Sequence, residues 1–107
     1  MKLVRPVSLL VAAFILAPTI ASADGPEVFK AQKCTDCHSV SGAGISRSAS
    51  PSETAPDLSK VGGKHDKRAI ATYLLKKSEI NGAKHKKTFS GSTDDLKAVA
   101  EWLGTLK

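Results

Sequence analysis

Residues 34–38 read Cys34-Thr35-Asp36-Cys37-His38, and they are the stretch on which the fold and the chemistry of this chain depend. The two cysteines are the only ones in the sequence. Three residues apart on a helical turn, their thiols point the same way, and a histidine directly after them can bind a metal. Cys-x-x-Cys-His is the attachment motif for c-type haem, in which each thiol forms a thioether with one haem vinyl group. The motif therefore predicts one covalent haem c, held by Cys34 and Cys37, with His38 as the proximal iron ligand.

Other uses of the cysteine pair agree less well with the rest of the sequence. A redox dithiol of the thioredoxin type needs a strand, a loop and a helix around the pair, and no segment shows strand alternation. A zinc site needs a second pair of ligands, and the chain has no further cysteines. A simple disulfide is the third alternative, and the histidine directly after the pair favours haem attachment over it.

The first 23 residues have the three-part pattern of a secretory signal. Lys2 and Arg5 form a positive start, residues 7–20 are apolar and uncharged, and the small residues 21–23 end the segment. This pattern predicts export to the periplasm and cleavage before Asp24. A retained membrane anchor is the alternative, because residues 6–23 are free of charge. Pro18 and the small residues at the end of the segment disfavour it, so we expect no stable membrane insertion after cleavage.

The predicted mature chain is a single small domain with a moderately basic charge. It spans residues 24–107, and a domain of this size often needs a cofactor to complete its core. The whole chain has 16 Lys and Arg residues against 10 Asp and Glu residues, a net charge of +6, which the loss of Lys2 and Arg5 lowers to +4. Such a charge suits docking to an acidic protein surface or loose contact with anionic lipid. No basic stripe is interleaved with aromatic residues, so nucleic-acid binding is not expected.

The hydrophobic pattern predicts an all-α domain with three main helices. They cover about 24–34, from after Asp66 to about Lys77, and from after Ser92 to about Leu106. Asp24, Asp66 and Ser92 are residues that cap the first backbone donors of a helix. The last helix should bury the face that carries Leu96, Val99, Ala100 and Leu103.

Long irregular segments separate the predicted helices. Residues 39–65 are rich in Ser, Gly, Ala and Pro, and residues 78–91 include two glycines. Loops of this length are uncommon in a compact small domain. They are expected if they wrap around a large apolar cofactor, and whether residues 46–52 are ordered does not follow from the sequence.

Several residues around the motif match one known family in order. They are Gly25 and Phe29 before the motif, the motif itself, Ala55-Pro56-Asp57-Leu58, and Val99 and Trp102 in the last helix. From Asp24 onward, the chain thus resembles a class I cytochrome c over nearly its whole length. The resemblance implies the cytochrome c fold, with the last helix crossing the first. It also implies that the backbone carbonyl of Pro56 accepts a hydrogen bond from the proximal imidazole, and that Pro56, Leu58 and Phe89 lie against the haem.

The chain departs from that family at the sixth iron ligand, which is usually a methionine before the last helix. Met1 is the only methionine in the sequence, and it would leave with the signal. His85 is favoured by chemistry, because imidazole binds iron at neutral pH whereas a lysine must first lose a proton. Lys86 is favoured by register, since the family's methionine commonly lies three residues before a phenylalanine that resembles Phe89. His65 and a vacant sixth position are the remaining alternatives.

The sequence therefore predicts a monomeric electron carrier rather than an enzyme. Its haem iron would cycle between the ferrous and ferric states, with His38 and His85 as the favoured axial ligands. The alternative function is a haem protein with an open distal site that binds or senses small ligands or acts as a weak peroxidase. Either a solvated face or a docking surface for acidic redox partners explains the lysines near the expected haem, which are Lys30, Lys33, Lys76, Lys77, Lys84, Lys86 and Lys87.

Overall fold

The structure is a computed structural model that describes residues 24–48 and 55–107. The predicted signal, and part of the 46–52 segment, lie outside the described residues. These described residues form three α-helices, α1 (Gly25–Ala31), α2 (Lys67–Leu74) and α3 (Thr93–Thr105). Short 3₁₀ turns η1 (Cys34–Asp36), η2 (Ser41–Ala43) and η3 (Val61–Gly63) punctuate the chain between α1 and α2. Within the described ranges there is no strand, only isolated bridges, which agrees with the all-α prediction.

Each helix begins where the sequence predicted a cap. The side chains of Asp24, Asp66 and Ser92 accept hydrogen bonds from backbone N–H groups in the first turns of α1, α2 and α3. Asp94 and Asp95 lie in the first turn of α3, where negative charge is favoured by the helix dipole. These local contacts fix the starts of the helices independently of the packing.

The ends of the first two helices differ from the prediction. α1 stops at Ala31 instead of continuing to Cys34, and α2 stops at Leu74 instead of near Lys77. Lys33 and Lys76 adopt left-handed backbone conformations, with φ of 58° and 57°, and a left-handed residue ends a helix. After α1, this break turns the chain into η1, so that the haem motif starts a new turn of its own.

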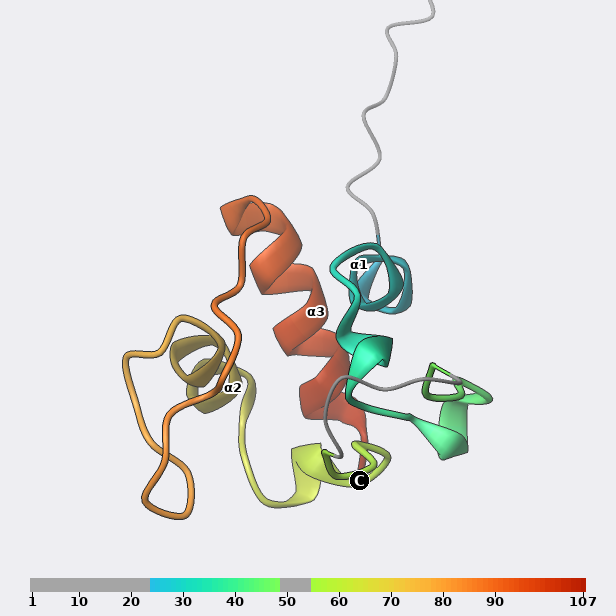
Figure 1. The fold of residues 1–107 in the computed structure, drawn as a ribbon, viewed down its shortest axis with the longest axis horizontal. Helices are drawn as coiled ribbons and strands as arrows, with labels where there is room; N and C mark the ends of the chain where they lie inside the picture. The colour runs from blue at the N-terminus through green and yellow to red at the C-terminus, as the bar shows by residue number, and fades with distance from the viewer. Residues whose placement is uncertain (1–23, 49–54) are drawn as a thin grey trace, which may run out of the picture.

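Helix α3 runs through the middle of the molecule, with α1 and α2 against different sides of it (Figure 1). Val99, Ala100 and Leu103 are buried, as predicted for this helix, while Leu96 is only half-buried. No helix in the described residues combines the length and apolarity needed to cross a membrane. The buried core of the described residues consists of Val28, Phe29, Val40, Ile45, Ile70, Val99, Ala100 and Leu103.

The crossing of α1 and α3 depends on one glycine and one aromatic pair. The rings of Phe29 and Trp102 meet edge to face, with centroids 5.6 Å apart and planes at 69°. A Cβ atom on Gly25 would lie 2.2 Å from Cβ of Trp102 and 2.9 Å from the carbonyl oxygen of Ala98. The two backbones can approach this closely only because Gly25 has no side chain.

We predict that Gly25→Ala destabilises the protein by roughly 1–3 kcal/mol, because neither Cβ of Trp102 nor a helix carbonyl can move away cheaply. The measurement is chemical denaturation of the purified holoprotein. Gly63→Ala is the matched control, since a Cβ there meets nothing within 4 Å. Equal stability of the two variants would contradict the prediction.

Candidate functional site

The cysteine pair and His38 form a compact turn directly after α1. The N–H groups of Cys37 and His38 both donate to the carbonyl of Cys34, at 3.2 and 2.9 Å. Burial raises the pKa of the Cys34 thiol, against the opposing charge of Lys87. The two thiols are not joined in a disulfide in the described chain. The turn therefore presents the two thiols and the imidazole from five consecutive residues, as the motif predicted.

The segment that carries Pro56 is held against this turn. Nδ1 of His38 donates a hydrogen bond to the carbonyl oxygen of Pro56, at 2.7 Å. The N–H of Leu58 donates to the carbonyl of Ser39, at 2.9 Å, and the N–H of Ala55 donates to that of Cys37, at 3.2 Å. The contact between His38 and Pro56 is the one that the resemblance implied, and Leu58 packs against the buried core.

Asp57 anchors this segment and was not among the predicted site residues. Its carboxylate accepts hydrogen bonds from the Ser39 hydroxyl, at 2.7 Å, and from the N–H groups of Ser41 and Ser59, both at 2.9 Å. Together with the side chain of Ser59, these donors hold the pKa of Asp57 far below its ordinary value of 3.8. An aspartate followed by a serine two residues later is the sequence signal of such a turn. It fixes the segment from which Pro56 accepts its hydrogen bond.

The second histidine lies beside the first. The imidazole rings of His38 and His85 are within 10° of parallel, and their centroids are 6.2 Å apart. Nδ1 of His85 donates to the carbonyl oxygen of Lys87, at 2.5 Å. In both rings Nδ1 is thus occupied by a carbonyl, which leaves Nε2 as the nitrogen with an available lone pair. Histidines that bind metals commonly have this arrangement.

Burial lowers the pKa of His38 below its ordinary value of 6.5. The hydrogen bond to Pro56 acts in the opposite direction, while nearby His85 and Arg47 add to the lowering. The imidazole is therefore neutral at neutral pH, and the neutral form is the one that binds a metal.

The loop that carries His85 is anchored on two sides. On one side, Nζ of Lys87 donates to the carbonyl of Gln32, at 3.1 Å, at the end of α1. On the other side, the N–H of Phe89 donates to the carbonyl of Leu74, at 3.0 Å, at the end of α2. Phe89, Leu74, Cys34 and His85 line one small cavity. The loop thus closes over the cysteine turn with partly buried apolar side chains beneath it.

The remaining sixth-ligand alternatives have different surroundings. Lys86 is exposed. His65 is half-buried at the turn after η3, where its N–H donates to the carbonyl of Val61, at 3.0 Å. Of the three residues, His85 is the one whose ring is paired with His38.

The residues present fit a haem group in three respects. A metal–imidazole bond of about 2 Å, with the ring centre about 1.2 Å beyond the nitrogen, holds two axial rings about 6.3 Å apart, which agrees with the 6.2 Å between His38 and His85. Leu58, Leu74 and Phe89 are apolar and only partly buried. Nε of Arg47 is buried without a partner among the described residues, although its Nη2 donates to the carbonyl of Ala55. A buried guanidinium requires an acceptor, and a haem propionate would supply one.

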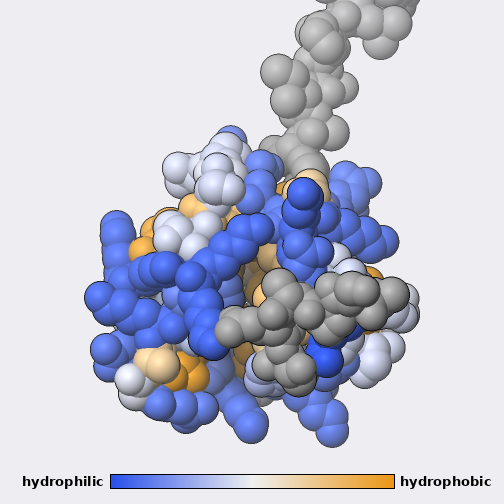
Figure 2. Space-filling view, viewed as in Figure 1, coloured by the Kyte–Doolittle hydropathy of each residue, from blue (hydrophilic) through white to orange (hydrophobic). Residues whose placement is uncertain are grey.

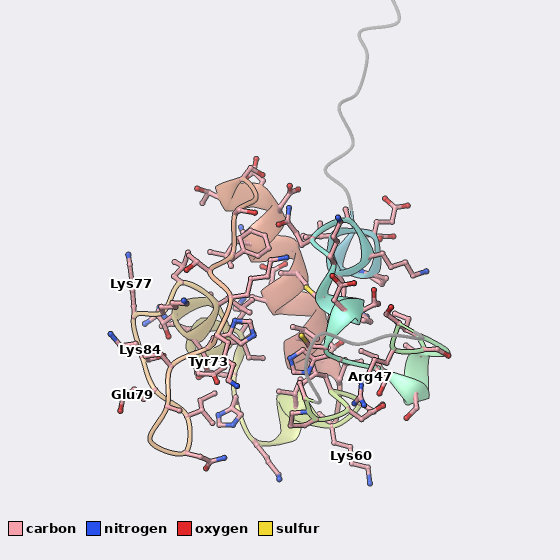
Figure 3. The ribbon with its side chains drawn as sticks, viewed as in Figure 1. Arg47, Lys60, Tyr73, Lys77, Glu79 and Lys84 are labelled. Atoms are coloured by element: carbon pink, nitrogen blue, oxygen red, sulfur yellow. The ribbon has the colours of Figure 1, made fainter. Side chains whose placement is uncertain are left out.

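Arg47 was also missed by the sequence reasoning, because a single arginine in a Ser-rich loop has no distinguishing pattern. In Figure 3, Arg47 and Tyr73 lie on opposite sides of the central region, while Lys77, Lys84 and Glu79 point outward at the left edge. Figure 2 shows hydrophobic surface near the centre of the same face, with hydrophilic residues around it. The described side chains thus form a polar rim around an apolar centre.

Three helices around a Cys-x-x-Cys-His turn, with a second imidazole nearly parallel to the first, define the class of small all-α haem-binding proteins. Residues 22–107 match the family model described as Cytochrome c. The chain therefore belongs to the cytochrome c family, whose members transfer electrons through covalently bound haem c and iron. No curated protein and no solved structure matches the chain.

We predict that Asp57→Asn lowers the stability of the holoprotein in a pH-dependent manner. Because the folded-state pKa is depressed, the carboxylate stabilises the fold at pH values above the unfolded-state pKa near 3.8. That contribution disappears as the pH falls below this value. Urea unfolding of the wild type and the variant should therefore differ most near neutral pH and converge in acid.

Asp94→Asn, which removes an exposed carboxylate from the first turn of α3, is the control and should lower the stability near neutral pH by less than Asp57→Asn does. If Asp57→Asn shows the same profile as the wild type, Asp57 does not hold the segment.

Proposed function

We propose that this protein is an exported monohaem cytochrome c in which His38 and His85 bind the iron from opposite sides. When bound, the haem iron supplies a one-electron couple between the ferrous and ferric states. Cys34 and Cys37 would hold the porphyrin through thioethers, and Pro56, Leu58 and Phe89 would lie against it. The parallel pair of imidazoles, each with Nδ1 bonded to a carbonyl, is the observation that supports this proposal most strongly.

The chain's own residues would tune the redox couple in two ways. The hydrogen bonds from His38 to Pro56 and from His85 to Lys87 would fix the tautomers and the orientations of the two imidazoles. Nitrogen ligands donate more strongly than a thioether and so favour ferric iron, and the potential should therefore lie below that of a cytochrome with methionine as the sixth ligand. An imidazole at both positions also leaves no coordination site for a small ligand, which disfavours peroxidase activity.

Export would bring the mature chain, residues 24–107, to the periplasm. The sequence pattern of residues 1–23 supports this part of the proposal. The mass of the purified holoprotein tests it, because cleavage before Asp24 gives the mass of residues 24–107 plus one haem. A mass that includes the first 23 residues would mean that the segment is retained.

We predict that His85→Ala converts the iron from low-spin to high-spin. The loss of the imidazole opens the sixth position, so the ferrous variant should bind carbon monoxide, whereas the wild type should not. Absorption spectra in both oxidation states are the measurement. Lys86→Ala and His65→Ala are matched controls that should remain low-spin.

A low-spin spectrum for His85→Ala would remove His85 from the proposal, and loss of that spectrum in Lys86→Ala would assign the ligand to Lys86. A wild type that is already high-spin and binds carbon monoxide would support the open-site function instead.

Redox partners with acidic docking surfaces are part of the same proposal. Lys84 is exposed and directly precedes His85, and Lys77 lies at the same edge (Figure 3). Lys87 has a structural role because its ammonium group caps the end of α1. The docking surface thus excludes Lys87 and relies on the lysines that point outward.

We predict that Lys84→Glu slows electron exchange with an anionic redox reagent such as hexacyanoferrate. Attraction between opposite charges speeds encounter and weakens as salt is added, so the variant should also show a smaller salt dependence. Stopped-flow kinetics over a range of ionic strength provide the measurement. Lys107→Glu, with the same charge change at the C-terminus, should have a smaller effect, and equal effects would argue against a local docking surface.

A further inference from the structure

Tyr73 contacts the second histidine from helix α2. Its ring lies edge to face against that of His85, with centroids 5.2 Å apart and planes at 67°. Tyr73 is half-buried and occupies the last turn of α2, directly before Leu74. In Figure 3 its side chain extends from α2 toward the centre of the molecule. Tyr73 belongs neither to the haem motif nor to the expected axial ligands, so its contact with His85 has no role in the function proposed above.

An axial imidazole can rotate about its bond to the metal, so something else must fix the plane of its ring. For His38 the hydrogen bond to Pro56 does so, because Pro56 belongs to a segment that Asp57 ties down. For His85 the hydrogen-bond acceptor is the carbonyl of Lys87, only two residues away in the same loop. Although the loop is tied to α1 and α2 through Lys87 and Phe89, this hydrogen bond by itself does not tie the imidazole ring to a helix. The ring of Tyr73 is an aromatic contact to His85 that comes from a helix.

Because the loop that carries His85 is attached to α2, the rings of Tyr73 and His85 are held next to each other. The N–H of Phe89 donates to the carbonyl of Leu74, the residue next to Tyr73. α2 itself packs against α3 and buries Ile70 in the core. The position of the Tyr73 ring is therefore set by the helix packing, and the loop is fastened beside it.

We propose that Tyr73 is a positioning residue that sets the rotation of the His85 ring about its bond to the iron and so keeps the two axial imidazoles parallel. This inference rests on the proposed function, because it requires His85 to be the sixth ligand. The ring of His85 takes part in both contacts, at 67° to the ring of Tyr73 and at 10° to that of His38. Loss of the Tyr73 ring should therefore let the His85 ring rotate away from parallel with His38.

Parallel imidazoles have an electronic consequence that can be measured. Both rings then donate into the same one of two iron d orbitals that are otherwise close in energy, and this donation raises that orbital above the other. In the ferric state the unpaired electron occupies the raised orbital, and this favours ferric iron. Rotation of one ring away from parallel removes part of the splitting and raises the reduction potential. Axial ligation and its surroundings are among the means by which a protein tunes haem iron.

The first test uses the wild-type ferric holoprotein. Electron paramagnetic resonance of low-spin haem distinguishes parallel from perpendicular axial imidazoles. Parallel rings give a rhombic spectrum with three resolved g values, and perpendicular rings give a strongly anisotropic spectrum dominated by one large g value. We expect the rhombic spectrum. Where His85→Ala has shown that the low-spin state depends on His85, a strongly anisotropic spectrum of the wild type would overturn the inference without any Tyr73 variant.

The second test compares substitutions at Tyr73. Tyr73→Phe keeps the ring and should retain the rhombic spectrum and the potential of the wild type. Tyr73→Leu removes the ring edge and should shift the spectrum toward the strongly anisotropic form, with a higher potential, while the iron stays low-spin. Ile70→Val is the matched control on the same helix. It removes one methyl group from the buried core and keeps both Tyr73 and His85, so it should lower the thermal midpoint and leave the spectrum unchanged.

The outcomes separate this inference from the proposed function. A Tyr73→Leu variant that stays low-spin with a wild-type spectrum overturns the positioning role and leaves His85 as a ligand. A Tyr73→Phe variant that changes as much as Tyr73→Leu also overturns it, because the hydroxyl group would then be the active part. If His85→Ala remains low-spin, it is the proposed function that fails.

Discussion

The close crossing of α1 and α3 is the contact on which the other features of this structure depend. Gly25 lets the two helix backbones approach, and the edge-to-face pair of Phe29 and Trp102 fixes how they cross. Because the cysteine turn begins three residues after the end of α1, this crossing also positions both thiols and His38. α2 packs against α3 as well, so α3 is the common support for the two sides of the site.

Backbone carbonyls and one carboxylate then organise the site from loops that have almost no regular structure. Pro56 and Lys87 each supply a carbonyl to one imidazole, and Asp57 fastens the Pro56 segment to the residues after the motif. Hydrogen bonds to Gln32 and Leu74 attach the second loop to α1 and α2. Long loops can form a well-defined site here because each is attached at several points to a helix or to the cysteine turn.

The starts of the helices were predictable because they depend on residues next to one another in sequence, such as Asp66 and Ser92, whose side chains cap the first turn. Their ends were less predictable. Lys33 and Lys76 adopt a left-handed backbone that lysine does not signal. The anchoring roles of Asp57 and Arg47 were not predicted either. The partners of Asp57 include serines 16 and 18 residues away. No sequence pattern indicates the buried Nε of Arg47 or its hydrogen bond to Ala55.

By itself, the sequence determined which residues stand on one side of the site. The five consecutive residues from Cys34 to His38 form the motif that predicts thioether attachment and a proximal imidazole, since a single turn sets their spacing. It also determined that no methionine lies between residues 24 and 107. Only the tertiary structure decided which residue faces His38. His85 is far from it along the chain, and the sequence favoured His85 by ligand chemistry but its neighbour Lys86 by register. The pairing arises from helix packing and loop attachment, which bring the two imidazoles together through contacts that no short stretch of sequence contains.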